Sequence, residues 1–225
     1  MNNSNDGVRA ALPYVAPMAI FMGMLWLGPK LGIGEWEFPL RVVILAAAVW
    51  FFSRDVLDLR AKAWRGSIVV GVAVFVVWVG PDALIPGYRS HWIFQNSITG
   101  KVATSIDTAL LTSPMVLVFR IIRAVILVPI IEELFWRGWL LRWLVKNDFQ
   151  QVPIGAYTPS AVIITALLFA SEHGPYWEVG LIAGLVYNFW VIRTRSLADC
   201  IVAHAVTNAV LCGYVLATGK WEYWL

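Results

Sequence analysis

The sequence predicts an all-α, polytopic integral membrane protein, and three observations support this fold class. The chain has 225 residues, of which 60% are hydrophobic and only 14% are charged, whereas soluble domains usually carry about 25% charged residues. Long apolar runs recur along the chain. Thirteen tryptophans are typical of a chain that crosses several membrane–water interfaces. We expect six to eight transmembrane helices in a single membrane domain, residues 1–225.

The apolar runs indicate where these helices lie. A spanning helix needs about 20 apolar residues, and several runs are shorter, so we expect some helices to be tilted, broken or re-entrant. Between the third and fourth runs, the polar segment Pro81–Asp107 is expected to form an interfacial loop or surface helix. The runs are Leu12–Gly28, Leu40–Phe52, Ser67–Val79, Ala124–Ile131, Ala161–Ala170, Val179–Ile192 and Leu197–Ala217.

Charge and cysteine content narrow the class further. Basic residues gather between the second and third runs, in SRDVLDLRAKAWR, and the positive-inside rule places this segment and the N-terminus on the cytoplasmic side. We expect a multi-pass protein of the cell membrane, with the lipid bilayer as its partner. The net charge of +3 does not indicate nucleic-acid binding. Cys200 and Cys212 lie inside the last apolar run and do not form a disulfide framework.

Three charged residues interrupt the run IIEELFWRGWLL, residues 130–141. Charges inside a membrane are costly and usually face the protein interior and a partner. Glu133 and Arg137 are four residues apart and can pair on one helix face. Glu132 lies about 100° round the helix from Glu133, which leaves it without a local partner. The alternative interpretation is a structural ion-pair network that fixes helix packing.

The length of this helix predicts its depth in the membrane. From Arg120 to Arg142 a helix extends about 33 Å at roughly 1.5 Å per residue, which matches the hydrocarbon thickness. We expect these arginines to snorkel to the two membrane surfaces, with Glu132 and Glu133 near the middle. Pro129 is expected to kink the helix.

Two further stretches carry polar residues at helical spacing. In FASEHG, Phe169 and His173 are four residues apart, and in AHAVTN, His204 and Asn208 are four residues apart. Each pair therefore shares a helix face and can line a polar cavity within the membrane. The alternatives are an interfacial role for His173 and a helix–helix hydrogen bond for Asn208. Glu172 points away from its neighbour His173 and is interpreted as structural or at a rim.

The motifs EELFWRG, FASEH and HAVTN, in this order, resemble the three motifs of the CAAX-protease and bacteriocin-processing family of membrane endopeptidases. The resemblance covers residues 128–210. Each motif alone is weak, but their order and spacing together are specific. The size of the chain also resembles the bacterial subgroup associated with PEP-CTERM protein sorting, which implies a bacterial inner membrane.

The resemblance implies a membrane-embedded, glutamic-type endopeptidase that uses neither metal nor other cofactor. Its substrate would be a membrane-anchored or lipidated protein or peptide. Glu132 would be the catalytic glutamate, His173 would help it to activate water, and His204 with Asn208 would stabilise the oxyanion. Burial raises the pKa of a carboxylate, which suits Glu132 to act as a base near neutral pH. The supporting motif residues would be Glu133, Arg137 and Phe169.

Within the single domain, residues 111–217 would hold the catalytic helices around the polar cavity. Residues 1–110 would form variable N-terminal helices and the interfacial loop, which match no motif.

Three other functions remain open at this stage. Two histidines and a glutamate can bind zinc, although the chain lacks the H-E-x-x-H motif. Cys200 lies four residues before His204 and could serve as a nucleophile. A non-enzymatic membrane scaffold, an immunity factor or a transport-related protein would also place Glu and His inside the membrane.

Overall fold

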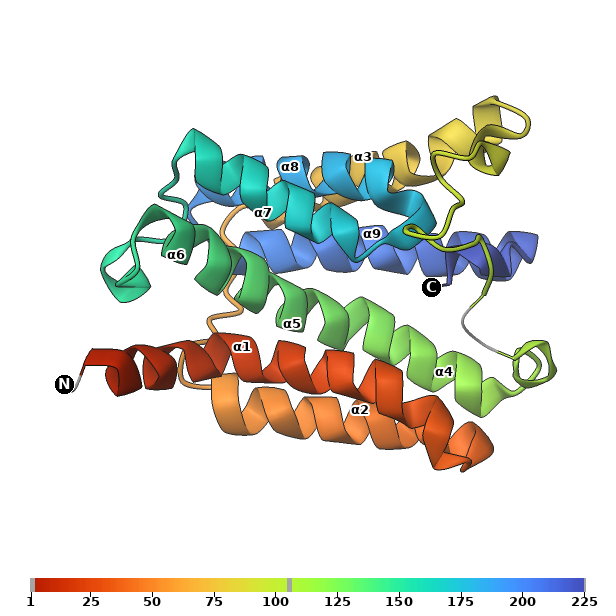
Figure 1. The fold of residues 1–225 in the computed structure, drawn as a ribbon, viewed down its shortest axis with the longest axis horizontal. Coiled ribbons are helices and arrows are strands. Elements are labelled where there is room, and N and C mark those ends of the chain that lie inside the picture. Colours follow the sequence, from red (N-terminus) through yellow and green to blue (C-terminus); the bar gives the residue numbers. More distant parts are fainter. Residues whose placement is uncertain (1–2, 105–106, 225) are drawn as a thin grey trace.

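Every regular element of the computed structural model is a helix; the structure describes residues 3–104 and 107–224, and no strand occurs in this part of the chain (Figure 1). The predicted all-α class is thereby confirmed. The main helices are α1 (Asn3–Leu27), α2 (Glu37–Ala48), α3 (Trp64–Leu84), α4 (Pro114–Ile122), α5 (Val128–Glu133), α6 (Leu141–Val145), α7 (Pro159–Ser171), α8 (Trp177–Thr194) and α9 (Leu197–Thr218).

Five helical segments within the described residues are long and apolar enough to cross a membrane. One of them, Pro114–Val145, combines α4, α5 and α6 into a single continuous helix of 32 residues. The apolar helix α7 has only 13 residues and packs against α8 as a helical hairpin. The polytopic character is therefore confirmed, with five candidate spans in the described residues where the sequence predicts six to eight; neither α7 nor α8 is among the five.

The long helix α4–α6 runs through the middle of the molecule (Figure 1). Helices α1 and α2 pack along one side of it, and α7 and α9 contact its other side. Helix α3 packs on α9 and α8, which places α3, α7, α8 and α9 together on that second side. The central helix thus separates an N-terminal helix pair from a four-helix group.

Helices α3 and α9 approach closely at Gly71. A Cβ atom at this position would overlap the carbonyl oxygen of Ala203, so only glycine permits the contact. Thr207 Oγ1 donates a hydrogen bond to the Gly71 carbonyl at 2.8 Å, and Tyr187 Oη donates to Thr207 Oγ1 at 2.7 Å. These bonds join α3, α9 and α8, as expected where small residues let helix backbones meet within a membrane.

The central helix is interrupted by wider, π-helical turns at Arg123–Leu127 and Leu134–Leu140. At the first of these, the Val128 N–H bonds to the Arg123 carbonyl, five residues earlier. The corresponding partner of Ala124 would be Pro129, which has no N–H. The Ala124 carbonyl instead accepts a hydrogen bond from Asn208 Nδ2 at 2.8 Å, so a side chain of α9 satisfies the interrupted helix.

The expectation that Arg120 and Arg142 snorkel to the membrane surfaces is wrong. Both side chains are buried, with 5% and 7% of the residue exposed. Arg142 donates to the carbonyls of Val152 and Gly138 at 2.6 and 2.8 Å, and Arg120 lies over the Trp224 ring at 5.0 Å. These two side chains face the protein interior, where carbonyl oxygens and an aromatic face stabilise the guanidinium groups.

The loop after α3 is anchored by a buried ion-pair cluster. Arg89 contacts Asp82 at 3.1 Å and Glu178 at 2.6 Å, which fixes the loop to the start of α8. Tyr223 Oη donates to Asp82 at 2.9 Å. Burial, together with this hydrogen bond, raises the pKa of the Tyr223 hydroxyl, so the group remains a donor.

Candidate active site

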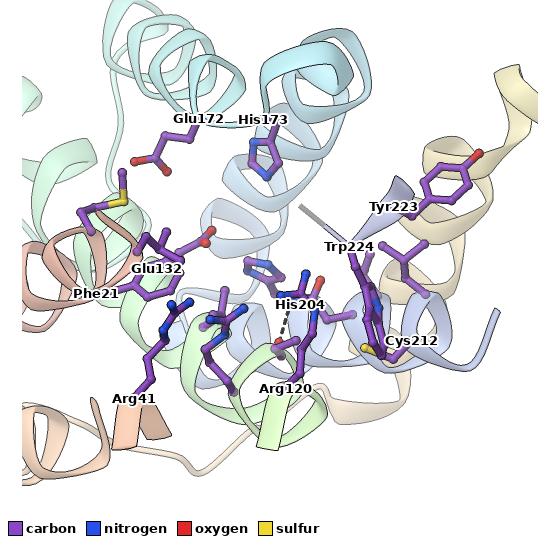
Figure 2. A pocket seen from close by; sticks show the side chains of 18 of the residues that line it. Phe21, Arg41, Arg120, Glu132, Glu172, His173, His204, Cys212, Tyr223 and Trp224 are labelled. Atoms are coloured by element: carbon purple, nitrogen blue, oxygen red, sulfur yellow. Dashed lines mark hydrogen bonds between the residues drawn. The ribbon is translucent and has the colours of Figure 1, made fainter. Parts of the chain in front are cut away.

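A cavity of about 470 Å³ lies between the N-terminal helix pair, the central helix and the four-helix group. Its walls are mostly apolar. The four residues predicted as catalytic all line it: Glu132 from α5, His173 from the end of α7, and His204 and Asn208 from α9. Figure 2 shows Glu132, His173 and His204 facing this common space. Phe169 also lines the cavity.

Glu132 is buried, with 8% of the residue exposed, and its Oε2 atom has no hydrogen-bond partner among the described residues. Glu172 lines the cavity as well, with an exposed side chain, and Figure 2 places its carboxylate on the same side as His173. The position of Glu172 agrees with its interpretation as a rim residue. Glu132 is therefore the buried carboxylate that the cavity leaves available to a bound molecule.

Glu133 has the opposite environment and does not line the cavity. It is completely buried, and its Oε1 atom accepts hydrogen bonds from Arg137 Nη1 at 3.1 Å and from His204 Nδ1 at 2.9 Å. Its Oε2 atom accepts from the Cys200 thiol at 3.1 Å. The predicted pairing of Glu133 with Arg137 is present, and it extends to a residue of α9.

Arg137 connects this network to α8. Its Nε atom donates to Asn188 Oδ1 at 3.0 Å, and Nη2 donates to the Gly184 carbonyl at 3.1 Å. Asn188 in turn donates to the Val162 carbonyl of α7 at 3.0 Å. Sequence reasoning missed Asn188, which is fully buried; an asparagine inside the apolar run GLVYNFW was the available signal.

The two histidines are each held by one ring nitrogen. His173 Nδ1 lies 2.7 Å from the Phe169 carbonyl, which can only accept, so Nδ1 carries the proton. His204 Nδ1 donates to the Glu133 carboxylate in the same way, and its ring stacks on Tyr187 at 5.0 Å. Both arrangements leave Nε2 as the ring nitrogen available to the cavity.

Asn208 both bonds to the central helix and lines the cavity. One amide N–H makes the helix–helix hydrogen bond to Ala124 that the sequence offered as an alternative. Because the side chain also lines the cavity, its amide has a second N–H for another acceptor.

The positions of these side chains also test two alternatives from the sequence, a cysteine nucleophile and a metal site. Cys200 is completely buried, donates to Glu133 and does not line the cavity, so a substrate in this cavity cannot reach its sulfur. Within residues 3–104 and 107–224, no group of three or more His, Cys, Asp or Glu side chains is arranged to hold a metal ion.

The fold and the cavity together define a polytopic membrane protein with acid–base side chains around one cavity between its helices. Residues 113–210 match the family model of type II CAAX prenyl endopeptidases, described as Rce1-like. The match includes all three motifs. It confirms the resemblance of this segment to the CAAX-protease family. This segment is therefore similar to membrane proteases, which are hydrolases. Neither a curated protein nor a solved structure matches the chain.

Proposed function

We propose that the protein is an intramembrane endopeptidase that hydrolyses a peptide bond with water activated by Glu132 and His173. The observation that carries this proposal is the buried, unpartnered carboxylate of Glu132 in a cavity that it shares with two imidazoles and an amide. A carboxylate and an imidazole that line one cavity provide the proton acceptors that water-driven hydrolysis requires.

The proposed reaction runs through a tetrahedral intermediate. Glu132 takes a proton from water as the water oxygen attacks the substrate carbonyl carbon, and the Nε2 lone pair of His173 holds the water in place. When the intermediate collapses, the carbon–nitrogen bond breaks, and Glu132 returns its proton to the leaving amine. The products are a new carboxylate and a new amine.

His204 and Asn208 are assigned to the developing oxyanion. The second amide N–H of Asn208 supplies one donor. His204 supplies the other from Nε2 when its ring is protonated, and the Glu133 carboxylate at Nδ1 stabilises that charge. Donors fixed in advance at the site of developing charge are among the largest contributors to catalysis. Glu133 and Arg137 therefore act as positioning residues.

The substrate proposed is a membrane-anchored or lipidated protein or peptide. The apolar walls of the cavity suit a lipid-modified chain, and residues of the N-terminal helices, including Phe21 and Phe38, help to form them. The PEP-CTERM-associated subgroup and the bacterial inner membrane remain predictions.

The proposal is tested by comparing the termini of membrane proteins in cells that express the wild-type chain or the Glu132→Gln or His173→Ala variant. Both variants are expected to lose the new termini while they accumulate to normal levels. Asp55→Asn is the matched control, because this carboxylate is exposed on a loop, and it should cleave normally. Undiminished cleavage by purified Glu132→Gln would rule out the mechanism.

A further inference from the structure

Three buried arginines line the same cavity as the proposed catalytic residues. Arg41 comes from α2, Arg120 from α4, and Arg123 from the π-helical turn that follows α4. The exposed fraction is 6% for Arg41 and 5% for each of the other two. Figure 2 shows Arg41 and Arg120 on the wall that faces Glu172 and His173. Residues far apart in the sequence therefore form one cationic wall.

Among the described residues, three arginines and one carboxylate line this side of the cavity. Glu37 pairs with Arg41 and is the carboxylate that lines the cavity on that side. In the described part of the chain, Nε and Nη1 of Arg123 and Nε of Arg41 have no hydrogen-bond partner. Arg123 is therefore a buried cation whose donors remain available to a ligand.

The unpartnered donors of Arg123 are costly without a ligand. Buried charges destabilise a protein unless they are paired and hydrogen-bonded, and the three guanidinium groups also repel one another. Guanidinium groups present a planar set of donors that matches the two oxygens of a carboxylate. A carboxylate on this wall would use the free donors and reduce the repulsion.

We propose that Arg41, Arg120 and Arg123 form an anion subsite that binds a carboxylate group of the peptide substrate. The inference rests on the proposed function, since the substrate must enter this cavity to reach Glu132. The carboxylate is either the C-terminal group of the peptide or an Asp or Glu side chain near the cleaved bond. Binding it on the arginine wall keeps it apart from Glu132 and fixes which bond meets the activated water.

The first test measures binding without requiring cleavage. Decanoate and its neutral analogue decanamide are added to the purified full chain in detergent, and thermal unfolding is recorded. Decanoate should raise the Tm of the wild type more than decanamide does, and Arg123→Gln should abolish the difference. Arg65→Gln, an exposed arginine outside the cavity, should retain it. Equal effects of the two probes on the wild type would overturn the proposal.

The second test uses cleavage of matched peptides. One pair differs in a free or amidated C-terminus, and another carries Asp or Asn beside the cleaved bond; the pair that discriminates identifies the source of the carboxylate. For the preferred acid, Arg123→Gln should raise KM about tenfold, as expected when one charge-assisted hydrogen bond is lost, with a smaller effect on kcat. Wild-type cleavage that is equally efficient for acid and neutral peptides would contradict the subsite but leave the protease intact.

Conversely, decanoate binding that depends on Arg123, in a chain that cleaves no peptide, would support the anion site and refute the proposed protease. Stabilisation by decyl phosphate at concentrations where decanoate has none would indicate a lipid phosphate and overturn the assignment to a peptide carboxylate.

Discussion

At the scale of single residues, two adjacent glutamates have opposite environments. Glu132 faces the cavity with an unpartnered oxygen, whereas Glu133 accepts hydrogen bonds from Arg137, His204 and Cys200. The cause is the helix itself, which turns about 100° per residue and so directs neighbours to different surfaces. The same side chain can therefore serve chemistry at one position and structure at the next.

This contrast predicts different effects on stability. Glu133→Gln should lower the free energy of unfolding by about 3 kcal/mol or more, because it leaves the Arg137 charge buried without its counter-ion. Glu132→Gln should leave stability unchanged or raise it, since it removes a buried, unpartnered charge. Thermal unfolding in detergent measures both variants. An equal loss of stability in the two would mean that Glu132 also has a structural partner.

At the scale of elements, the irregular central helix is a candidate membrane span and also lines the cavity. The sequence predicts a disturbance at Pro129, because proline cannot donate a hydrogen bond to the preceding turn. It does not predict how the disturbance is satisfied. The structure shows that Asn208, from a helix far along the chain, donates to the Ala124 carbonyl. A wide turn of this kind is frequent at functional sites.

The Asn208–Ala124 bond should be coupled to Pro129. Asn208→Ala leaves a partly buried carbonyl without a donor and should cost about 1–3 kcal/mol. In a Pro129→Ala background the restored N–H can serve the helix carbonyls, so the cost of Asn208→Ala should fall by about 1 kcal/mol, a typical coupling between contacting residues. A double-mutant cycle of unfolding free energies checks this. If the cost is the same in both backgrounds, proline is not what leaves the carbonyl free.

At the scale of the whole molecule, the cavity exists because helices from both halves of the chain meet around it. Its walls include α1 and α2 as well as the helices that carry the three motifs, so the site is not confined to the segment that matches the protease family. The close contact of α3 with α9 at Gly71 sets the position of His204 and Asn208, since both lie on α9 near Ala203.

Gly71→Ala should therefore separate α3 from α9. The added methyl group would overlap the Ala203 carbonyl, and overpacking of this kind costs about 1–3 kcal/mol. We expect a lower Tm and reduced cleavage. Gly80→Ala, in the same helix but with open space around it, is the matched control and should be neutral or slightly stabilising. Equal behaviour of the two variants would show that α3 can shift without cost.

The sequence by itself determined the membrane class, the helical runs and the spacing of the motif residues. The bilayer requires long apolar helices, and residues four apart share a helix face. Both properties depend only on neighbouring residues, so the pairing of Glu133 with Arg137 could be predicted from the sequence. Only the tertiary structure decided that His204 bonds to Glu133, that Asn188 holds Arg137, and that Arg120 and Arg123 join Arg41 around a cavity. These contacts depend on how each helix is rotated about its axis relative to its neighbours. Close packing between distant helices and the π-helical turns of the central helix set that rotation.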